Sequence, residues 1–438
     1  MKIAVIGLGF VGLSLASVLG SKNFNIIGID TDLKKIEKIK KGIPPFIEPK
    51  LETTLKIGLK KKLKISSKFK DVESCDLIFV AVGTPQLSDG SIDLKNIKLV
   101  AKTLGKQYQN STKKVIIIIK STVIPGTTLE IIKILEKTSK RKHGKDFDVI
   151  TNPEFLRESK AVEDTISPHL IVIGGETSNS LKKLLNFYRN MHPNIPIIKT
   201  NYQTAEMIKY ANNAFLATKI SFINQIASIC EKIPGSNVED IAKAIGLDPR
   251  IGELFLKAGP GYGGSCLPKD VKALINFSKN SGVEPILLKA VDTTNRLQIK
   301  KIERILEKIL KNIQNKHIAI LGVAFKANTD DIRDSISINL IKLLLKKGSK
   351  ITIHDPMAIE NTRKIFKNKI AYGNSIKNTL KNTNCVIIMT DSNIYQNILK
   401  NDFLTMKNKF VIDTRRILNH KNLDIEYHAI GLGKKRKF

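Results

Sequence analysis

Short apolar runs alternate with helix-like stretches through the first part of the chain. These runs are Ile3–Ile6, Asn25–Ile29, Leu77–Ala81, Val115–Lys120, Asp148–Thr151, Leu170–Ile173 and Ile197–Lys199. Apolar runs of this length, separated by helical segments, are typical of buried strands joined by crossover helices. The pattern therefore predicts a doubly wound α/β domain with a parallel sheet over residues 1–200.

The pattern changes at Thr204, where helical spacing replaces the strands. A long helix is predicted from there to about Lys232. Its apolar residues form a broad stripe, made of Met207, Ile208, Ala211, Phe215, Ile220, Ile223 and Ile226. Lys209 and Asn213 are i,i+4 neighbours on one face, slightly off that stripe. We predict a central helical domain over residues 201–300, whose surplus of apolar residues suggests a dimer core.

A second α/β unit begins near His317. Its predicted strands are Ile318–Leu321, Lys350–His354, Cys385–Thr390 and Phe410–Asp413. The first turn of this unit, Gly322-Val323-Ala324-Phe325, lacks the glycine spacing of a dinucleotide site. The expected fold is therefore α/β, with Rossmann-like doubly wound domains at residues 1–200 and 301–438 joined by a long-helix dimerisation region.

Glycines at the end of the first strand suggest a cofactor. Gly7-Leu8-Gly9-Phe10-Val11-Gly12 follows the strand and opens a helix-like stretch, which is the required context of the G-x-G-x-x-G fingerprint. Such a turn lets a pyrophosphate approach the helix N-terminus. Asp30, at the end of the second strand, would hydrogen-bond a ribose 2′-hydroxyl and repel a 2′-phosphate. We therefore predict NAD rather than NADP. Lys34 and Lys35 lie nearby and could weaken this preference, but we interpret them as solvated helix residues.

The segment Gly261-Tyr262-Gly263-Gly264-Ser265-Cys266-Leu267-Pro268-Lys269-Asp270 carries a candidate nucleophile. Cys266 follows a flexible glycine-rich turn and precedes a proline suited to the first turn of a helix. The helix N-terminus and the neighbouring Lys269 both favour the thiolate form of the cysteine. Asp270 follows at i+4, near enough to orient a water or exchange a proton. We therefore expect a reactive thiol here rather than a buried structural cysteine.

Polar residues also follow two strands of the first predicted sheet. The strand Leu77–Val82 ends at Gly83-Thr84-Pro85, and the strand Val115–Lys120 ends at Ser121-Thr122. Both ends fall at carboxyl edges of parallel strands, where open α/β sheets bind ligands. Thr84 and Thr122 are therefore predicted to lie close to a bound ligand.

Composition limits the classes of protein that the chain can belong to. It has 438 residues, too many for one ordinary core, and no apolar run approaches the length of a membrane helix. Met1 is followed at once by the first strand, which leaves no room for a signal peptide. The four cysteines, at positions 75, 230, 266 and 385, show neither paired nor metal-ligand spacing. We expect a cytoplasmic enzyme without a metal.

The formal net charge of +33 raises the question of nucleic acid or an anionic membrane as partner. The lysines are spread along the whole chain with abundant Ile and Asn, a compositional bias typical of an A+T-rich genome. Aromatic residues amount to only 6%, and Trp is absent. The basic tail Lys434–Lys437 is interpreted as a frayed, solvated end. We expect no specific nucleic acid and no membrane, although a positive field would attract anionic ligands such as NAD.

Together with the glycine turn and Cys266, further motifs point to a family. They are Lys120-Ser121-Thr122-Val123, Asn152-Pro153-Glu154-Phe155-Leu156-Arg157-Glu158, Glu206-Met207-Ile208-Lys209-Tyr210-Ala211-Asn212-Asn213, Arg250-Ile251-Gly252 and Gly322-Val323-Ala324-Phe325-Lys326. In order and spacing, over nearly the whole chain, they resemble the UDP-glucose/GDP-mannose dehydrogenase family of nucleotide-sugar 6-dehydrogenases. The resemblance implies that the C-terminal domain holds the nucleotide of the substrate.

The resemblance also implies a role for individual residues. Catalytic roles fall on Cys266, Lys209, Asn213, Asp270, Thr122, Glu154 and Glu158. Contacts to NAD fall on Gly7, Gly9, Val11, Gly12, Asp30, Lys35, Thr84, Thr122, Glu158, Lys269 and Arg333. Contacts to the substrate fall on Glu154, Phe155, Leu156, Arg157, Glu158, Lys209, Asn213, Arg250, Phe255, Leu256, Lys257, Ala258, Gly259, Gly263 and Lys326. Arg250 matches an arginine that the neighbouring subunit of a homodimer offers, and either Arg415 or Arg416 reaches the nucleotide phosphates.

The implied reaction oxidises a primary alcohol to a carboxylate, which removes four electrons and so needs two NAD in turn. Cys266 would add to the intermediate aldehyde, and the thiohemiacetal would be oxidised to a thioester and hydrolysed with the help of Asp270. Lys209 and Asn213 would stabilise the charge that develops on the sugar oxygen. Glu154 and Glu158 could instead be carboxylates near the start of a helix.

The identity of the sugar is less firmly indicated than the family. UDP-glucose, oxidised to UDP-glucuronate, is the leading substrate, and GDP-mannose or a UDP-N-acetylhexosamine is the alternative. Ser159 is a departure, because glucose-type enzymes usually have glycine at that position and serine is reminiscent of the GDP-mannose branch. A nucleotide-binding protein with a retired active site is the competing class, and the intact Cys266, Lys209, Asn213 and Asp270 argue against it.

Overall fold

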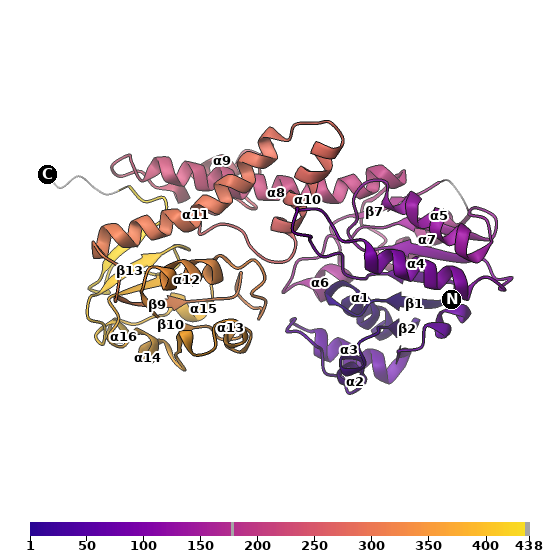
Figure 1. Cartoon of the computed structure of the whole chain (residues 1–438), viewed down its shortest axis with the longest axis horizontal. Coiled ribbons are helices and arrows are strands. Elements are labelled where there is room, and N and C mark those ends of the chain that lie inside the picture. Colours follow the sequence, from indigo (N-terminus) through magenta and orange to yellow (C-terminus); the bar gives the residue numbers. More distant parts are fainter. Residues whose placement is uncertain (177–178, 434–438) are drawn as a thin grey trace. The chain divides into compact units, whose positions relative to one another are not determined.

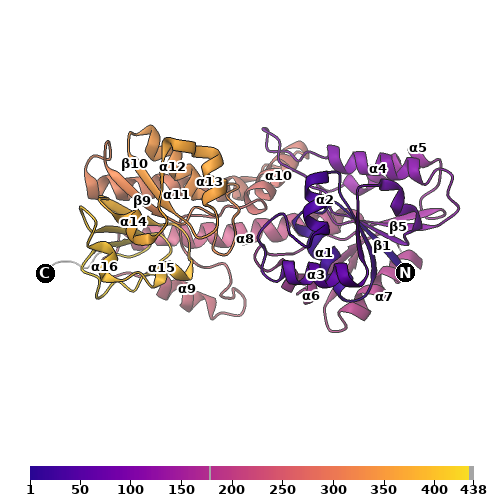
Figure 2. The same cartoon turned by 90° about the horizontal axis from the view of Figure 1, so that it is seen from below.

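The computed structural model describes residues 1–176 and 179–433, and the chain divides into two compact units between Asn212 and Asn213. Each unit is built around its own mainly parallel sheet with helices packed on it (Figures 1 and 2). The expected α/β class with two sheet domains is confirmed. The division into three domains at residues 200 and 300 stays a prediction, and the basic tail lies outside the described residues.

The sheet of the first unit has eight strands in the order β3-β2-β1-β4-β5-β6-β7-β8. The strands are β1 Lys2–Ile6, β2 Asn25–Ile29, β3 Leu63–Ser66, β4 Leu77–Val80, β5 Val115–Ile119, β6 Phe147–Thr151, β7 Ile171–Gly174 and β8 Ile197–Thr200. The strand order reverses between β1 and β4, which is the topological switch point where open α/β sheets bind ligands.

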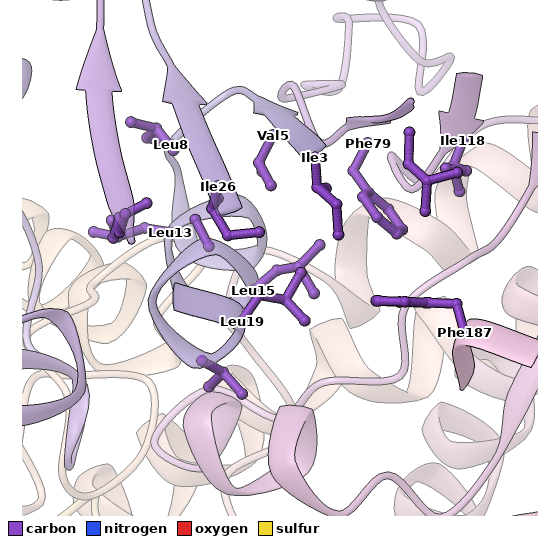
Figure 3. Packing of buried hydrophobic residues seen from close by; sticks show 14 of the residues in the cluster. Ile3, Val5, Leu8, Leu13, Leu15, Leu19, Ile26, Phe79, Ile118 and Phe187 are labelled. Carbon is purple, nitrogen blue, oxygen red and sulfur yellow. The ribbon is translucent and has the colours of Figure 1, made fainter. Parts of the chain in front are cut away.

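Alternate residues of the strands face two layers of helices. On one face, Ile3 and Val5 pack with α1, α3 and α7, as Figure 3 shows for part of this cluster. On the other face, Ala4 and Ile6 pack with α4 and α5. The helices are α1 Phe10–Ser21, α2 Leu33–Lys40, α3 Leu51–Lys61, α4 Lys95–Gln107, α5 Thr127–Ser139, α6 Ala161–Ile166 and α7 Asn179–Met191, with a 3₁₀ turn η1 at Phe69–Ser74. Each fully buried Leu or Ile contributes roughly 1.5–3 kcal/mol to folding.

Two features of this sheet differ from the prediction. The edge strand β3 has the sequence Leu-Lys-Ile-Ser, in which Lys64 is exposed, so it lacks the continuous apolar run by which the other strands were found. The sheet is also not wholly parallel, because β7 pairs with β6 in the antiparallel sense through Thr151 and Gly174. The order of the strands along the chain did not reveal this reversal.

The long helix α8, Tyr202–Cys230, continues from the first unit into the second. The predicted apolar stripe is wrong in part, because Phe215 is 66% exposed and Ala211 is exposed as well. Lys209 and Asn213 lie on the buried face instead of beside it. Their polar groups can be buried because Lys209 forms an ion pair with one carboxylate, that of Glu154, and Asn213 donates a hydrogen bond to another, that of Asp270.

The second unit contains a six-stranded parallel sheet in the order β11-β10-β9-β12-β13-β14. The strands are β9 His317–Leu321, β10 Lys350–His354, β11 Ala371–Tyr372, β12 Cys385–Ile388, β13 Phe410–Asp413 and β14 Glu426–Ala429. The helices after α8 are α9 Val238–Gly246, α10 Leu267–Asn280, α11 Ile286–Leu310, α12 Ile336–Lys346, α13 Ile359–Phe366, α14 Ile376–Leu380, α15 Asn393–Gln396 and α16 Lys400–Phe403, with a 3₁₀ turn η2 at Lys367–Lys369. Edge strands β11 and β14 were not predicted.

Buried residues of the second unit form clusters on both faces of its sheet. Ile318 and Ile320 pack with α11 and α12 on one face, and Ala319 and Leu321 pack with the segment that contains α14–α16 on the other. Over the described part of the chain, no helix combines the length and apolar character needed to cross a membrane. Within the same residues, no group of His, Cys, Asp and Glu is arranged to hold a metal ion.

Candidate active site

In the glycine turn after β1, backbone atoms lie too close to Gly7 and Gly12 for a side chain, whereas Gly9 faces open space. Gly7 has φ +90°, and a Cβ on Gly12 would lie 1.8 Å from the carbonyl oxygen of Gly7. A Cβ on Gly9, in contrast, would meet no described atom within 4 Å. Gly9 is the N-cap of α1, and Val11 lies in the first turn of that helix. Open space in front of the α1 N-terminus fits the pyrophosphate of a dinucleotide.

Asp30 lies at the carboxyl end of β2 and ties the glycine turn to the next helix. Its Oδ2 accepts hydrogen bonds from the Leu8 N–H at 2.9 Å and from the Lys35 Nζ at 2.9 Å, and its Oδ1 accepts one from the Asp32 N–H. Burial raises the pKa of Asp30, but these hydrogen bonds outweigh burial and hold it below the usual value. The interpretation of Lys35 as a solvated residue is wrong, whereas Lys34 is exposed as expected.

Thr84 and Thr122 come together at the carboxyl edge of the first sheet. Thr84 follows β4, Thr122 follows β5, and the Thr84 hydroxyl donates to the Thr122 carbonyl oxygen at 2.8 Å. Both residues follow carboxyl ends of parallel strands, as predicted, although the contact of either residue with NAD stays a prediction. The same edge carries Gly7 at the end of β1, because β1 and β4 are hydrogen-bonded neighbours.

Glu154 and Lys209 form a buried ion pair in the first unit. Lys209 Nζ lies 3.2 Å from Glu154 Oε1 and 5.3 Å from the centre of the Phe155 ring. Glu154 Oε2 accepts a hydrogen bond from the Leu156 N–H. The alternative interpretation of Glu154 as a helix-start carboxylate is wrong, because α6 begins only at Ala161. Glu154 therefore holds the ammonium group that was expected to face a developing oxygen charge.

Lys120 was quoted within a motif but was not predicted as a site residue. Its Nζ donates to Asn152 Oδ1 at 3.1 Å, and the same oxygen accepts a hydrogen bond from the Tyr188 hydroxyl. Burial lowers the pKa of Lys120 to about 8, and the positive charge of Lys209 contributes to this shift while Glu154 opposes it. Lys120, Asn152 and Glu154 line one pocket of the first unit. The signal that could have indicated Lys120 was its position as a lysine at the end of an apolar strand.

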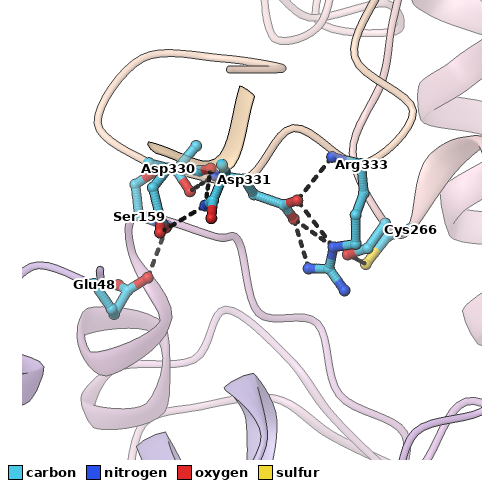
Figure 4. Close-up of polar contacts among 9 residues, drawn as sticks. Glu48, Ser159, Cys266, Asp330, Asp331 and Arg333 are labelled. Carbon is cyan, nitrogen blue, oxygen red and sulfur yellow. Dashed lines mark hydrogen bonds and ion pairs between the residues drawn. The ribbon is translucent and has the colours of Figure 1, made fainter. Parts of the chain in front are cut away.

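The loop between Glu154 and α6 is held by its own ion pair. Arg157 donates through its side chain and backbone to Asp164, with Nη2 2.6 Å from Asp164 Oδ1. Ser159 has φ +65°, and its N–H donates to Glu48 at 2.8 Å, as Figure 4 shows. A left-handed backbone explains why glycine is usual at this position, because glycine adopts it without steric cost. Serine is less suited than glycine to this backbone conformation, and nothing in the structure explains its presence at this position.

In the second unit, Cys266 stands at the predicted place. It is the exposed N-cap of α10, which begins at Leu267 with Pro268 in its first turn. Gly261 and Gly264 both have positive φ, +110° and +83°, so the turn before the thiol needs glycine. The expected combination of turn, thiol and helix start is confirmed.

Asp270 lies one helical turn after Cys266 and is 1% exposed. Its Oδ2 accepts a hydrogen bond from Asn213 Nδ2 at 2.6 Å, and Lys269 Nζ donates to its Oδ1. Two donors on one buried carboxylate fix its direction. The structure therefore brings together Asn213 and Asp270, two of the predicted catalytic residues.

The predicted sugar loop, residues 255–259, is fastened to α8. The Gly259 N–H donates to Asn224 Oδ1 at 2.8 Å, and Asn224 is 1% exposed. Phe255 has φ +67°, an unusual backbone conformation for a bulky residue. Asn224 was not predicted, although its position eleven residues after Asn213 puts both on one face of the helix.

The two arginines after β13 have different surroundings. Arg416 pairs with Glu239 at 3.1 Å and donates to the Ile430 carbonyl oxygen, so it ties α9 to the last strand. Arg415 donates through Nε to the Met389 carbonyl oxygen, and its Nη1 would lie 3.4 Å from a Cβ on Gly259. Burial lowers the pKa of Arg415. Arg415, rather than Arg416, therefore lies beside the predicted sugar loop.

Four further predicted site residues lie in the second unit, and their contacts do not test the roles predicted for them. Lys269 pairs with Asp270, and Arg333 makes a two-pronged ion pair with Asp331 (Figure 4), so their contact with NAD stays a prediction. Lys326 lies over the Phe325 ring. Arg250 is 87% exposed and pairs with Asp248, which leaves its guanidinium at the surface.

The fold and these sites define a class of protein. A glycine turn at the switch point, an open helix N-terminus and a carboxylate at the end of β2 fit the pyrophosphate and ribose of NAD. Among the described residues, the second unit places an exposed thiol one helical turn before a carboxylate that Asn213 holds. These features together define a dinucleotide-dependent dehydrogenase.

Comparisons with known proteins agree along the whole chain. Models of the UDP-glucose/GDP-mannose dehydrogenase family match its NAD binding domain at residues 1–192, its central domain at 203–297 and its UDP binding domain at 319–420. The chain is 39% identical to UDP-glucose 6-dehydrogenase from Rickettsia conorii, covering 98% of this chain and 99% of that protein. It is 37% identical to UDP-glucose 6-dehydrogenase TuaD from Bacillus subtilis, covering 98% and 93%.

A solved structure gives the same result. The UDP-glucose dehydrogenase from Pyrobaculum islandicum superposes with a TM-score of 0.92 at 33% identity, covering 98% of each chain. The chain therefore belongs to the UDP-glucose/GDP-mannose dehydrogenase family, as its motifs indicated. It is an NAD-dependent dehydrogenase, and the predicted cofactor is confirmed.

Proposed function

We propose that the chain oxidises UDP-glucose to UDP-glucuronate with two NAD and one water for each acid formed. The observation that carries this proposal is whole-chain similarity to enzymes named UDP-glucose 6-dehydrogenase. The exposed Cys266 at the start of α10 supports a covalent route for the second oxidation.

In the first step, the C6 hydroxyl of the sugar loses a proton and two electrons leave its carbon as a hydride. Lys209 is proposed to stabilise the negative charge that develops on the oxygen, and its pairing with Glu154 holds the ammonium in place. The Asn213 amide, fixed by Asp270, is proposed to donate a hydrogen bond to the same oxygen. NAD, when bound, accepts the hydride in each of the two oxidations.

In the second step, the Cys266 sulfur bonds to the aldehyde carbon, and the aldehyde oxygen becomes the hydroxyl of a thiohemiacetal. Loss of a second hydride and of the hydroxyl proton converts the thiohemiacetal to a thioester. Water then attacks the carbonyl carbon, the carbon–sulfur bond breaks, and the acid and the thiol are released. The buried Asp270 carboxylate is proposed to accept the proton of that water.

The cofactor is proposed to lie at the carboxyl edge of the first sheet. Gly7, Gly9 and Gly12 would admit its pyrophosphate, and Asp30, neutralised in part by Lys35, would accept a ribose hydroxyl. Thr84 and Thr122, which follow β4 and β5, would contact the cofactor at this edge. Glu158, as its motif implies, would help to position water.

The nucleotide of the substrate is proposed to lie against residues 255–259, with Lys326 and Arg415 facing its phosphates. Arg415 is preferred over Arg416 because it lies beside Gly259, whereas Arg416 is engaged by Glu239 and backbone carbonyls. Arg415→Ala should raise the KM for the nucleotide sugar at least ten-fold with little change in unfolding temperature. Arg416→Ala, the matched control, should lower the unfolding temperature and leave KM within about two-fold.

A panel of nucleotide sugars tests the proposed substrate. NADH formation is followed with UDP-glucose, GDP-mannose and a UDP-N-acetylhexosamine, each supplied with NAD. The proposal expects the highest kcat/KM for UDP-glucose. Faster turnover of GDP-mannose or of the N-acetylhexosamine would show that a sister activity of the family is the correct one.

We also propose a homodimer in which each active site receives Arg250 from the partner. Apolar side chains on α8 and in the following segment support it, because Phe215, Phe222, Leu247 and Leu254 are between 51% and 76% exposed. Mixing inactive Arg250→Ala and Cys266→Ser chains should restore activity, since mixed dimers then contain one complete site. No recovery in proven mixed dimers would refute the sharing of Arg250.

A reducing compartment, the cytoplasm, would suit the exposed thiol.

A further inference from the structure

Asn295, on α11, holds the backbone of the turn that leads to Cys266. Its Oδ1 accepts a hydrogen bond from the Tyr262 N–H at 2.8 Å, and its Nδ2 donates to the Tyr262 carbonyl oxygen at 2.9 Å. One amide side chain therefore satisfies both backbone groups of one residue. Both residues are buried, with Asn295 7% and Tyr262 5% exposed.

The turn is shaped to receive this amide. Gly261 has φ +110°, and a Cβ on it would lie 2.6 Å from Asn295 Oδ1. Any side chain at Gly261 would therefore displace the amide that holds the next residue. The absence of a side chain at Gly261 thus lets the backbone approach Asn295.

The other side of the turn is held by the loop after β9. The Gly264 N–H donates to the Arg333 carbonyl oxygen at 3.0 Å, and a Cβ on Gly264 would meet the Phe325 ring at 2.7 Å. Figure 4 draws this Arg333 together with Cys266. Two residues beyond Gly264, the Cys266 carbonyl oxygen accepts the Asp270 N–H at 2.9 Å. The backbone from Tyr262 to Cys266 is thus anchored at three points.

We propose that Asn295 is a positioning residue for the Cys266 thiol in the second oxidation. The inference rests on the proposed function, in which Cys266 must meet the aldehyde before that aldehyde leaves. A buried backbone N–H and C=O that lose their partners are costly, so the turn relaxes when the amide is removed. A thiol displaced by about 1 Å reacts more slowly, by a factor on the order of 100.

The test compares Asn295→Ala with a matched control, Gln298→Met. Gln298 lies one turn further on α11, is 3% exposed, and its Cγ would lie 3.5 Å from a Cβ on Gly261. Its Nε2 donates to Thr294 in its own helix, and its Oε1 has no hydrogen-bond partner among the described residues. Both variants therefore disturb packing against the turn, but only Asn295→Ala removes the clamp on Tyr262.

The decisive readout is the ratio of NADH to acid. The native enzyme should form about two NADH per acid, because four electrons leave the sugar. A mispositioned thiol lets aldehyde escape after the first oxidation, so Asn295→Ala should form clearly more than two NADH per acid, with the excess recovered as trapped aldehyde. Gln298→Met should stay at two. Simple loss of folded protein lowers both products equally and leaves the ratio unchanged.

Asn295→Asp adds a pH signature. The ionised carboxylate repels the Tyr262 carbonyl oxygen, whereas the protonated acid can donate to it as the amide does. The NADH-to-acid ratio of this variant should therefore fall toward two as the pH is lowered, while that of Asn295→Ala stays constant.

The outcomes separate this inference from the proposed function. Acid formed by Cys266→Ser at the native rate would refute the covalent route to the acid, and the positioning role with it. A native ratio of two with an unchanged ratio of two in Asn295→Ala would refute the positioning role alone.

Discussion

The two units carry similar turns after the central strand of each sheet. Gly7 follows β1 with φ +90°, and Gly322 follows β9 with φ +92°. In each unit a carboxylate at the end of the neighbouring strand accepts hydrogen bonds from the turn. Asp30 accepts the Leu8 N–H at 2.9 Å, and Asp355 accepts the Val323 N–H at 2.7 Å. The two α/β units thus share a strand–turn–carboxylate arrangement.

The two units differ in the segment directly after the turn. In the first unit α1 begins at Phe10, directly after the open position Gly9. In the second unit α12 begins only at Ile336, and Asp355 accepts the N–H groups of both Val323 and Ala324. The second unit therefore shares the glycine turn and the acid but lacks a helix that starts directly after them. A dinucleotide site needs an open helix N-terminus immediately after the turn.

The largest effect that separates the two turns is expected at Gly9. A Cβ there meets no described atom within 4 Å, so Gly9→Leu should fold with a nearly unchanged unfolding temperature. The added side chain fills the space proposed for the pyrophosphate, and NAD affinity should fall by about 100-fold, or about 2.7 kcal/mol. Calorimetric titration with NAD measures it. Native affinity in a folded variant would show that the cofactor lies elsewhere.

Gly322→Ala should have the opposite effect, a loss of stability with unchanged NAD affinity. The new Cβ would lie 2.1 Å from Thr390 Oγ1 in a left-handed backbone, so the second unit should lose about 2–4 kcal/mol of stability. NAD affinity, measured below the unfolding temperature, should stay within two-fold of native. Urea unfolding gives the first quantity and titration the second. Loss of NAD affinity in this variant would contradict the division of roles between the turns.

Asp30→Asn and Asp355→Asn form a smaller, paired test. Asp30→Asn should weaken NAD binding roughly ten-fold, and Asp355→Asn should leave it unchanged. The pKa of Asp30 is lowered in the folded protein, so its stabilising effect is present above its unfolded value near 3.8 and is lost as the pH falls through the folded pKa. The free energy of unfolding of Asp30→Asn should therefore fall less steeply at acid pH than that of the native protein. Equal effects of the two substitutions on NAD binding would refute the comparison.

A pH response of the stability is expected at Lys120. Its pKa is lowered to about 8 by burial, so the unfolded chain binds more protons there between pH 8 and about 10.5. Its contribution to stability should rise with pH across that window. Lys120→Met removes this rise, and urea unfolding of both proteins at pH 7, 9 and 10 measures it. Parallel pH profiles of the two proteins would contradict the assignment.

Local patterns predicted the elements whose cause is local. The strands β1, β2 and β10, the turn at Gly7 and the start of α10 after Cys266 all follow from short apolar runs, glycine and proline. Edge strands such as β3 and β14 were missed because few of their residues are buried, so the sequence carries little apolar signal.

The site was predictable in its motifs but not in its long-range pairs. Lys209 and Asn213 looked peripheral to an apolar stripe because their carboxylate partners, Glu154 and Asp270, are distant in sequence. The same reason hid the pairing of Asn295 with Tyr262. A buried polar side chain is explained by its partner, and helical periodicity carries no information about partners.

The central claim is that Cys266 carries the substrate between the two oxidations. Serine keeps the geometry of the site but is a far weaker nucleophile at neutral pH, so Cys266→Ser should bind NAD and the nucleotide sugar and fold normally. The most direct measurement is its steady-state rate of acid formation with UDP-glucose and NAD, beside that of the native enzyme. We expect at least a 100-fold loss of acid formation, with any bound intermediate held as an aldehyde or a slowly hydrolysed ester. Acid formed by Cys266→Ser at the native rate would contradict the covalent mechanism and the choice of nucleophile.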